Sequence, residues 1–188
     1  MARLTVVDIA VAAGMEQALV ADSISFEQLV AAHEGRVRRL AHRLLGWRDG
    51  SSDMDDVVQD VFLAAMKNLP RFRGEASIGT WLTRMTINRC RTHRRKQFLK
   101  LRWLGKQSVS DETPPTSYLA ADETSAKVRA AVQQLSPSYR EVIVLLYLEE
   151  LSVSEIAMLL GISRAAVDVR VHRARVRLKE KLTGLMDE

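Results

Sequence analysis

The stretch that decides the fold is residues 152–178, SVSEIAMLLGISRAAVDVRVHRARVRL. It opens with Ser152 and, three residues later, Glu155, the spacing of a capping box at a helix start. Gly161-Ile162-Ser163 follows and predicts a tight turn, after which Ser163 can cap the next helix. A helix, a three-residue turn with glycine and another helix form a helix-turn-helix unit.

The helix after this turn, Arg164 to about Leu182, has two chemically different faces. Apolar residues recur at helical spacing and are expected to pack inward: Ala166, Val167, Val171, Ala174 and Leu178. The residues left to point outward are mostly basic: Arg164, Asp168, Arg170, His172, Arg173, Arg175 and Arg177. Such a helix fits the DNA major groove, with base edges near its N-terminal half and phosphates near its arginines. A helical hairpin that binds no DNA is the alternative.

Composition bounds the remaining possibilities. The chain has 188 residues, of which 47% are hydrophobic and 27% charged, as in an ordinary globular protein. Its one cysteine, Cys90, excludes an internal disulfide framework and a Cys-rich zinc module, and fits a cytoplasmic, reducing setting. No apolar run of about 18 residues predicts a membrane span. Because no metal spacing, nucleophile motif or phosphate-binding glycine loop occurs, we expect neither an enzyme nor a cofactor.

Residues 107–125 are expected to form a linker. They contain Pro114-Pro115, which cannot continue a helix, many Ser and Thr residues, and only acidic charges. We therefore expect an N-terminal extension (1–21), a domain over 22–106 and a second domain over 126–188. Neither domain shows alternating strand patterns, whereas Ser136-Pro137 opens another apolar helix. The predicted fold class is all-α, with two small helical domains joined by a flexible linker.

Two basic blocks flank this linker. Residues 71–106 carry 11 basic side chains and one acid, Glu75, and residues 163–181 carry seven basic side chains and two acids. Two basic blocks around an acidic spacer indicate two contacts with a polyanion such as nucleic acid. Two solvated helix faces are the alternative.

The first predicted domain begins with a helix over Ser25–Leu45 and continues with one over Asp53–Asn68. The second helix has a single apolar stripe: Val57, Val58, Val61, Phe62, Ala65, Met66 and Leu69. Its other face carries Asp56, Gln59, Asp60, Leu63 and Lys67. On pattern alone, a solvated face is the favoured interpretation of these residues.

A third helix, Trp81 to about Lys96, follows a loop with Gly74 and is expected to be capped by Thr80. It is crowded with cations and polar groups: Arg84, Asn88, Arg89, Arg91, Arg94 and Arg95, beside Trp81. Arginines that neutralise phosphates, next to flat rings that accept unstacked bases, are what a separated DNA strand requires. The favoured alternative for Trp81 itself is a place in the core.

Several blocks in order resemble the extracytoplasmic-function (ECF) sigma factors of bacterial RNA polymerase. DDVVQDVFL (55–63), RFRGEAS (71–77) and Thr80-Trp81-Leu82 resemble the second conserved region of that family. Leu135-Ser136-Pro137, Tyr139-Arg140-Glu141-Val142, Ser154-Glu155-Ile156-Ala157, Leu160-Gly161-Ile162-Ser163 and His172-Arg173-Ala174-Arg175 resemble the fourth. The resemblance covers roughly residues 25–182.

The resemblance implies roles for these blocks. Asp56, Gln59, Asp60 and Leu63 would bind the clamp helices of core RNA polymerase. The loop over Gly74–Gly79 and the helix with Trp81, Arg84, Asn88 and Arg91 would recognise and melt the −10 promoter element, with one base flipped out of the duplex. Arg164, Asp168, Val169, His172, Arg173 and Arg175 would bind the −35 element. The implied partners are core polymerase (clamp helices and flap), promoter DNA and an anti-sigma protein, with no direct membrane insertion.

One departure concerns the sequence that the last helix would bind. Where the family commonly has a basic residue followed by serine, this chain has Asp168 and Val169, which suit a cytosine amino group and a thymine methyl group. The rival interpretation of the whole chain is a stand-alone helix-turn-helix regulator of duplex DNA. That interpretation does not explain a second basic helix that contains tryptophan.

Overall fold

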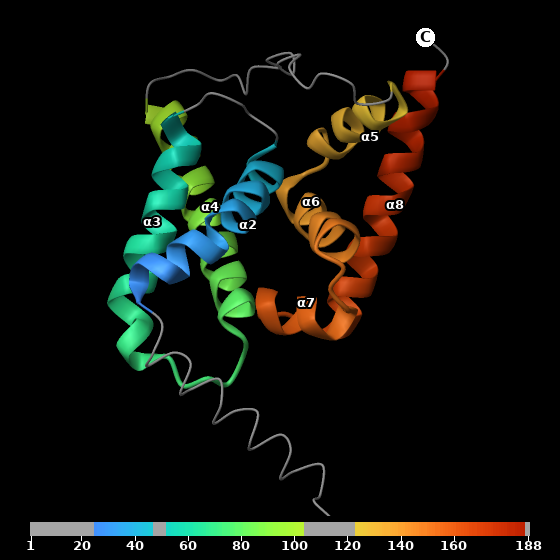
Figure 1. Ribbon diagram of the computed structural model, residues 1–188. Helices are drawn as coiled ribbons and strands as arrows, with labels where there is room; N and C mark the ends of the chain where they lie inside the picture. The colour runs from blue at the N-terminus through green and yellow to red at the C-terminus, as the bar shows by residue number, and fades with distance from the viewer. Residues whose placement is uncertain (1–24, 47–51, 104–122, 187–188) are drawn as a thin grey trace, which may run out of the picture. The chain divides into compact units, whose positions relative to one another are not determined.

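The computed structural model describes residues 25–46, 52–103 and 123–186, and the regular structure in these ranges is entirely helical (Figure 1). This confirms the predicted all-α class. The described residues fall into two compact units. One contains α2 as far as Ala41, α3 and α4, and the other contains α5 to α8 together with the residues from His42 to the end of α2. The predicted extension, 1–21, lies outside the described residues.

The first unit is built from α2 (Phe26–Leu45) as far as Ala41, α3 (Ser52–Asn68) and α4 (Ile78–Trp103). The start of α2 is capped reciprocally, since Ser25 Oγ accepts from the Gln28 backbone N–H at 3.3 Å and Gln28 Oε1 accepts from Ser25 N–H at 3.1 Å. Pro70 ends α3 inside a 3₁₀ turn, Leu69–Arg71. On the surface, Arg38 Nη1 of α2 pairs with Asp55 Oδ1 of α3 at 2.5 Å, which raises the pKa of Arg38.

The core of this unit follows the predicted apolar stripes. Leu29 and Leu40 of α2, Val61 of α3, and Leu82 and Ile87 of α4 are almost completely buried. The stripe predicted for α3 is wrong at one residue, because Met66 is 47% exposed whereas Ala64 is buried. The apolar stripe of α3 is therefore narrower at its C-terminal end than the sequence pattern indicates.

Helix α4 is longer than predicted at both ends. It begins at Ile78 because Ser77, not Thr80, provides the cap: Ser77 Oγ accepts from the Thr80 backbone N–H at 3.1 Å. The loop over Gly74–Gly79 therefore ends at Ser77, and Gly79 belongs to the helix. At the other end the helix continues past Lys96 to Trp103, since no proline or glycine interrupts it there.

The second unit consists of α5 (Glu123–Gln133), α6 (Pro137–Ile143), a π-helical turn over Val144–Leu148, α7 (Val153–Leu160) and α8 (Arg164–Met186). Helices α5, α6 and α7 all pack against α8. The last three residues of the predicted linker belong to α5, and residues 107–122 lie outside the described part. The core joins Val132, Leu135, Ile143 and Ala174, with Tyr139 and Leu178 at its edge.

Arg140 completes the C-terminal end of α5. The last carbonyl groups of a helix have no partner within the helix. The guanidinium group of Arg140 donates to the carbonyl oxygens of Gln133, Leu135 (3.3 Å) and Val132 (3.4 Å). The side chain of Arg140 thus joins α6 to the end of α5.

The helix-turn-helix has the predicted local chemistry. Ser152 Oγ accepts from Glu155 N–H at 3.3 Å, and a Glu155 carboxylate oxygen accepts from Ser152 N–H at 2.8 Å. These two hydrogen bonds form the capping box. The Ser152 hydroxyl also donates to Glu155 Oε2 at 2.6 Å, and this hydrogen bond, together with the one from Ser152 N–H, lowers the pKa of Glu155. Gly161 ends α7 with a left-handed φ of 66°, and Ser163 Oγ accepts from Ala166 N–H at 3.1 Å to start α8.

The start of α6 is as predicted, with Ser136 at the N-cap position and Pro137 as the first residue of the helix. The Ser136 hydroxyl makes no capping hydrogen bond. The backbone carbonyl of Ser136 instead accepts from Tyr139 N–H at 3.0 Å and from Arg140 N–H at 2.9 Å.

Among the described residues, no helix is both long and apolar enough to cross a bilayer.

Candidate nucleic-acid interface

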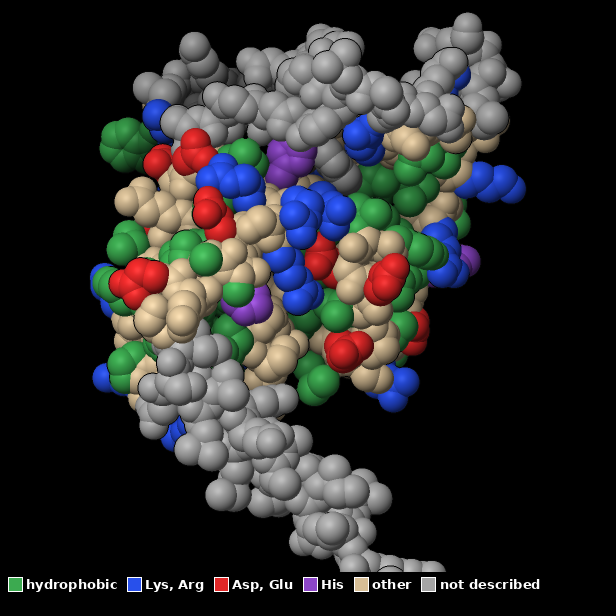
Figure 2. Space-filling view, in the orientation of Figure 1, with side chains coloured by type: hydrophobic (Ala, Val, Ile, Leu, Met, Phe, Trp, Pro, Cys, Tyr) green, Lys and Arg blue, Asp and Glu red, His purple; other side chains and the backbone are tan. Residues whose placement is uncertain are grey.

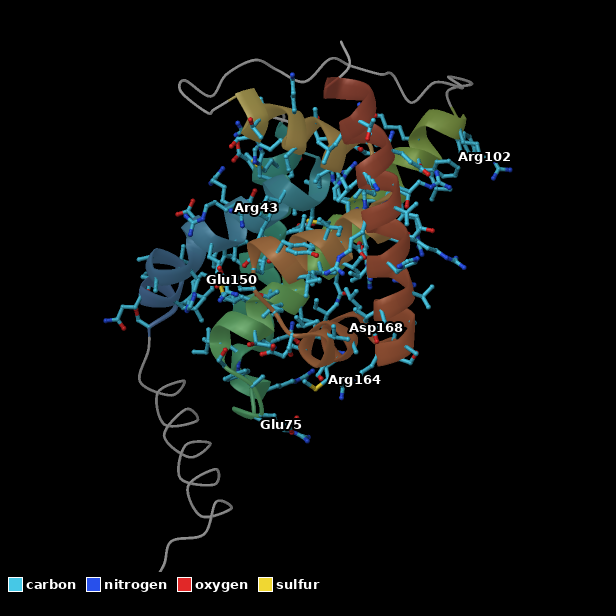
Figure 3. The ribbon with its side chains drawn as sticks, turned by 90° about the vertical axis from the view of Figure 1, so that its right-hand side faces the viewer. Arg43, Glu75, Arg102, Glu150, Arg164 and Asp168 are labelled. Carbon is cyan, nitrogen blue, oxygen red and sulfur yellow. The ribbon has the colours of Figure 1, made fainter. Side chains whose placement is uncertain are left out.

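The outer face of α8 carries the residues predicted to bind duplex DNA. All six predicted −35 residues are exposed: Arg164, Asp168, Val169, His172, Arg173 and Arg175. Basic side chains project from the part of the second unit that α8 forms (Figure 2). Arg164 and Asp168 lie at its N-terminal end (Figure 3). On the inner side Val167, Val171 and Ala174 are buried as predicted, so packing fixes which face of α8 is free for a ligand.

One of these arginines is held by a residue that sequence reasoning missed. Arg175 Nε donates to the hydroxyl oxygen of Tyr147 at 2.7 Å, and the guanidinium carbon lies 5.6 Å from the centroid of the Tyr147 ring. Tyr147 lies in the π-helical turn, Val144–Leu148, and is half exposed. π-helical turns often occur at functional sites, so in the structure this turn draws attention to Tyr147. The sequence carries no signal for such a turn, and Tyr147 could therefore not be predicted from it.

The predicted −10 residues share one face of α4. Trp81, Arg84, Asn88 and Arg91 follow one another at helical spacing, and Arg84 and Asn88 are exposed, whereas Trp81 and Arg91 are partly buried. Trp81 is thus neither a fully buried core residue nor a free one. The centroid of its ring lies 5.0 Å from that of Phe72, with the two rings tilted by 50°, a separation typical of aromatic pairs in contact. This pair holds the loop before α4 against the first turn of the helix.

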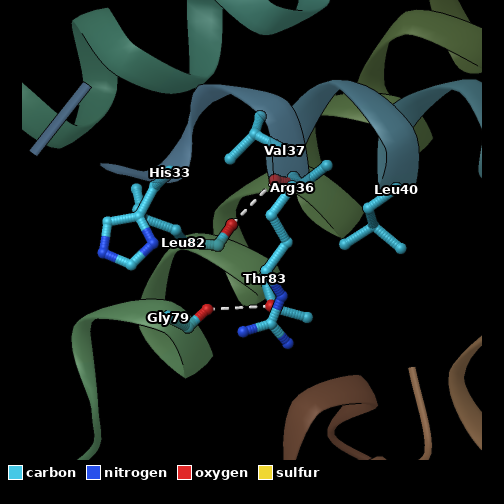
Figure 4. Close-up of a pocket in the computed structure, with 8 residues that line it drawn as sticks. His33, Arg36, Val37, Leu40, Gly79, Leu82 and Thr83 are labelled. Carbon is cyan, nitrogen blue, oxygen red and sulfur yellow. Dashed lines mark hydrogen bonds between the residues drawn. The ribbon is translucent and has the colours of Figure 1, made fainter. Parts of the chain in front are cut away.

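A groove between α2 and the start of α4 lies next to this loop (Figure 4). Its lining includes His33 and Arg36 of α2, and Gly79 and Thr83 of α4. A Cβ atom at Gly79 would lie 2.9 Å from Arg36 Nη1, so the absence of a side chain lets the arginine cross close to the helix. Thr83 Oγ1 donates to the Gly79 carbonyl oxygen at 2.8 Å. On the α2 side of the groove, burial and the nearby Arg36 cation lower the pKa of His33.

The predicted polymerase-binding residues also share one face. Asp56, Gln59, Asp60 and Leu63 are all exposed on α3, where Asp60 lies four residues after Asp56 and Leu63 lies four residues after Gln59. Leu63 is 43% exposed, and Met66, one turn further on, extends the apolar part of this surface. The opposite face, with Val58 and Val61, is buried. A mixed acidic and apolar surface of this kind fits a protein partner better than it fits DNA, because acids repel phosphate.

In the part of the chain that the structure describes, no group of three or more His, Cys, Asp or Glu side chains is placed to hold a metal ion. Cys90 is buried within the first unit.

Sequence reasoning also missed three exposed apolar residues at the end of α4, Phe98, Leu99 and Trp103, because it expected the helix to stop at Lys96.

Comparisons with known proteins match the chain in two separate regions. Residues 29–98 match the family model Sigma-70 region 2, and residues 125–178 match Sigma-70, region 4. Three similar relatives are the ECF RNA polymerase sigma factor SigW of Bacillus subtilis (30% identity, 87% of this chain and 92% of the relative), the RNA polymerase sigma factor NccH of Alcaligenes xylosoxydans xylosoxydans (35%, 88% of each chain) and the RNA polymerase sigma factor CnrH of Cupriavidus metallidurans (34%, 91% of each chain).

Solved structures show the same fold. The chain is similar to CnrH in its complex with the cytosolic domain of CnrY (TM-score 0.59, 32% identity, 94% of this chain and 97% of that chain). It is also similar in fold to the sigma factor RpoE in its complex with the anti-sigma factor NepR from Bartonella quintana (TM-score 0.68, 24% identity, 84% of this chain and 96% of that chain). With both sigma regions matched in order and relatives aligned over nearly their full length, the chain belongs to the ECF sigma factors, the alternative sigma factors that direct RNA polymerase.

Proposed function

We propose that this sigma factor recruits core RNA polymerase through α3, opens the −10 element through α4 and binds the −35 element through α8. The observation that carries the proposal is the outer face of α8, where a helix-turn-helix leaves Arg164, Asp168, His172 and Arg173 exposed on one helix. Side chains near the N-terminal end of such a helix reach base edges in the major groove, and arginines further along reach phosphates. The −35 duplex is therefore the ligand of α8.

The proposed −10 site is the face of α4 with Trp81, Arg84, Asn88 and Arg91. Asn88 and Arg84 are exposed polar groups that suit a base edge and a phosphate, respectively. The Phe72–Trp81 pair holds the preceding loop in place, so that a flipped base meets a site that is already formed. Flipping a base costs a few kcal/mol, and a preformed site lowers the ordering penalty that adds to it.

Core polymerase binds the exposed face of α3 in this proposal. Leu63 is an exposed apolar side chain that a partner can bury, and Asp56, Gln59 and Asp60 around it provide polar contacts that select the partner. This replaces the solvated face that the sequence pattern alone favours.

Run-off transcription tests the proposed function. Core polymerase with this protein is expected to initiate from the promoter upstream of its own gene, whereas core alone does not, and Asn88→Ala is expected to reduce initiation. A stand-alone regulator predicts the reverse pattern: tight binding of the isolated protein to duplex DNA and no gain in initiation with core. The match to Sigma-70 region 2 over residues 29–98 argues against that alternative.

An inhibitory protein partner is also part of the proposal. The similar structure of CnrH holds the cytosolic domain of a second protein, CnrY, and exposed apolar residues such as Leu63 and Met66 offer this chain a comparable surface. The partner is expected to compete with core polymerase for α3. In a competition assay, a purified candidate should displace the wild-type protein from core, and Leu63→Ala should weaken both complexes. A candidate that binds without displacing core would contradict this part of the proposal.

A further inference from the structure

The last turns of α4, residues 94–103, carry a second surface that the −10 residues do not include. Three large apolar side chains are exposed here: Phe98 (62%), Leu99 and Trp103 (91%). They come after the last predicted site residue on this helix, Arg91. Large apolar side chains that remain this exposed in a folded unit commonly mark a binding surface. We call residues 94–103 the α4 tail.

The charges of the α4 tail are all positive. Arg95, Lys96, Lys100 and Arg102 are exposed among the apolar residues. Across the whole of α4, from Ile78 to Trp103, the sequence contains no Asp or Glu. Arg102 projects away from the helix (Figure 3). The surface is therefore complementary to a polyanion and repels a basic partner.

Cations and apolar side chains share one face of the tail. Arg95 lies three residues before Phe98 and four before Leu99, and Arg102 lies four residues after Phe98. Residues three or four apart are neighbours on a helix surface. The inner face is marked by buried Cys90 and by His93 and Gln97, which are partly buried. The exposed face thus alternates rings and positive charges instead of separating them.

This alternation distinguishes between possible occupants. A helix that lies on a membrane separates a charged face from an apolar face, which is not the arrangement here. Duplex DNA offers phosphates to the cations. Its bases are stacked inside the duplex, so exposed aromatic side chains have no free base to stack on. A single nucleic-acid strand offers both a phosphate backbone and free base faces, which stack on aromatic side chains.

We infer that the α4 tail is a second DNA site, which binds a separated single strand by stacking bases on Phe98 and Trp103 and pairing phosphates with Arg95 and Arg102. Phe98 and Trp103 are five residues apart, which places them about 7.5 Å apart along the helix axis and about 140° apart around it. A strand that stacks on both rings therefore crosses the tail obliquely, past Arg102, which lies between them. That the strand comes from an opened promoter rests on the proposed function, whereas the binding itself does not.

The test uses the full-length protein and a fluorescent oligothymidine of roughly 16 nucleotides, which has no promoter sequence. Phe98→Ala and Trp103→Ala are each expected to weaken binding about tenfold, the loss of one stacked base. Arg95→Gln and Arg102→Gln are each expected to reduce the slope of log affinity against log salt by about 0.7. Because all four side chains are exposed, their replacement should leave the thermal unfolding midpoint unchanged.

Met158→Ala is the matched control, since Met158 is 70% exposed but lies on α7. It is expected to bind the oligothymidine as the wild type does. The inference is overturned if Phe98→Ala and Trp103→Ala bind like the wild type, or if they weaken binding to a duplex of equal length just as much. It is equally overturned if they lose binding only to vesicles of anionic phospholipid. Run-off transcription by the wild-type protein, measured separately, reports on the proposed function alone.

Discussion

Arg175 and Tyr147 form a coupled pair on the surface of the second unit, with a hydrogen bond of 2.7 Å from Nε to the hydroxyl and a guanidinium group 5.6 Å from the ring centroid. An arginine has five N–H donors, and this hydrogen bond uses only one of them. The remaining four can face a DNA phosphate. Tyr147 therefore orients an arginine of α8 without needing to touch DNA itself.

The pair predicts a specific non-additivity. Tyr147→Phe removes the hydrogen bond and is expected to weaken holoenzyme binding to −35 DNA about fivefold, which corresponds to about 1 kcal/mol. Arg175→Ala should weaken it more, and Tyr147→Phe should then add nothing. The measurement is a double-mutant cycle on a −35 duplex with holoenzyme.

Arg177→Ala is the control for this cycle, because Arg177 is exposed two residues further along α8. Its effect should add fully to that of Tyr147→Phe. If Tyr147→Phe is equally additive with Arg175→Ala, the pair is not coupled and Tyr147 has no positioning role.

Arg173 gives a prediction about the separation of surfaces. Arg173 is exposed on α8, far along the chain from the residues assigned to core polymerase. Arg173→Ala is expected to weaken −35-dependent binding about tenfold, the loss of one good base or phosphate contact, and to leave core association intact. Loss of core binding in a pull-down with purified core would show that the surfaces are assigned wrongly.

Much of the second unit can be predicted from the sequence because its signals are local. Ser152 with Glu155 specifies the start of α7 through hydrogen bonds between residues three apart, and Ser163 Oγ specifies the start of α8 in the same way. Gly161 ends α7 with a hydrogen bond to the carbonyl group four residues before it. The pairing of Tyr147 with Arg175 could not be predicted, because it depends on a π-helical turn and on packing between residues 28 apart in sequence.

The first unit shows a different limit. Ser77 and Thr80 both have hydroxyl groups that can cap a helix, and the sequence alone does not decide which one accepts the hydrogen bond. Nor does a breaker mark the end of α4, so the tail with Phe98 and Trp103 was missed. Met66 was expected in the core because an apolar stripe does not show where the partner helix ends.

Two glycines should respond differently to alanine. Gly161 has a φ of 66°, which strains any L side chain, and Gly161→Ala is expected to destabilise the second unit by about 1 kcal/mol. Gly79 lies within α4, where alanine is favoured, and its new Cβ would come too close only to the flexible end of Arg36, with Ser77 Oγ at an ordinary contact distance of 3.8 Å. Gly79→Ala should therefore be close to neutral in denaturant unfolding. Equal losses for both variants would contradict the assigned conformations.

His33 predicts a pH dependence of stability. Burial and the nearby Arg36 cation lower the pKa of His33 below its usual value of 6.5. The unfolded state therefore binds a proton at His33 more readily than the folded state does. The contribution of neutral His33 to the free energy of unfolding is thus present above about pH 6.5 and is lost as the pH falls toward the native pKa. His33→Gln should flatten the fall in the unfolding midpoint between about pH 7 and pH 5.5. An identical pH profile for the variant and the wild type would contradict this origin.

The central claim, that α4 meets the −10 element while α8 meets the −35 element, is tested most directly by DNA cleavage from tethered positions. Asn88→Cys and His172→Cys, each labelled with an iron chelate and assembled with core polymerase on promoter DNA, place the reagent on α4 and on α8. Cys90 is completely buried, so the labelled wild-type protein serves as the control. The account predicts cuts around −10 from Asn88→Cys and around −35 from His172→Cys. Cuts at the opposite elements, or none above the control, would contradict it.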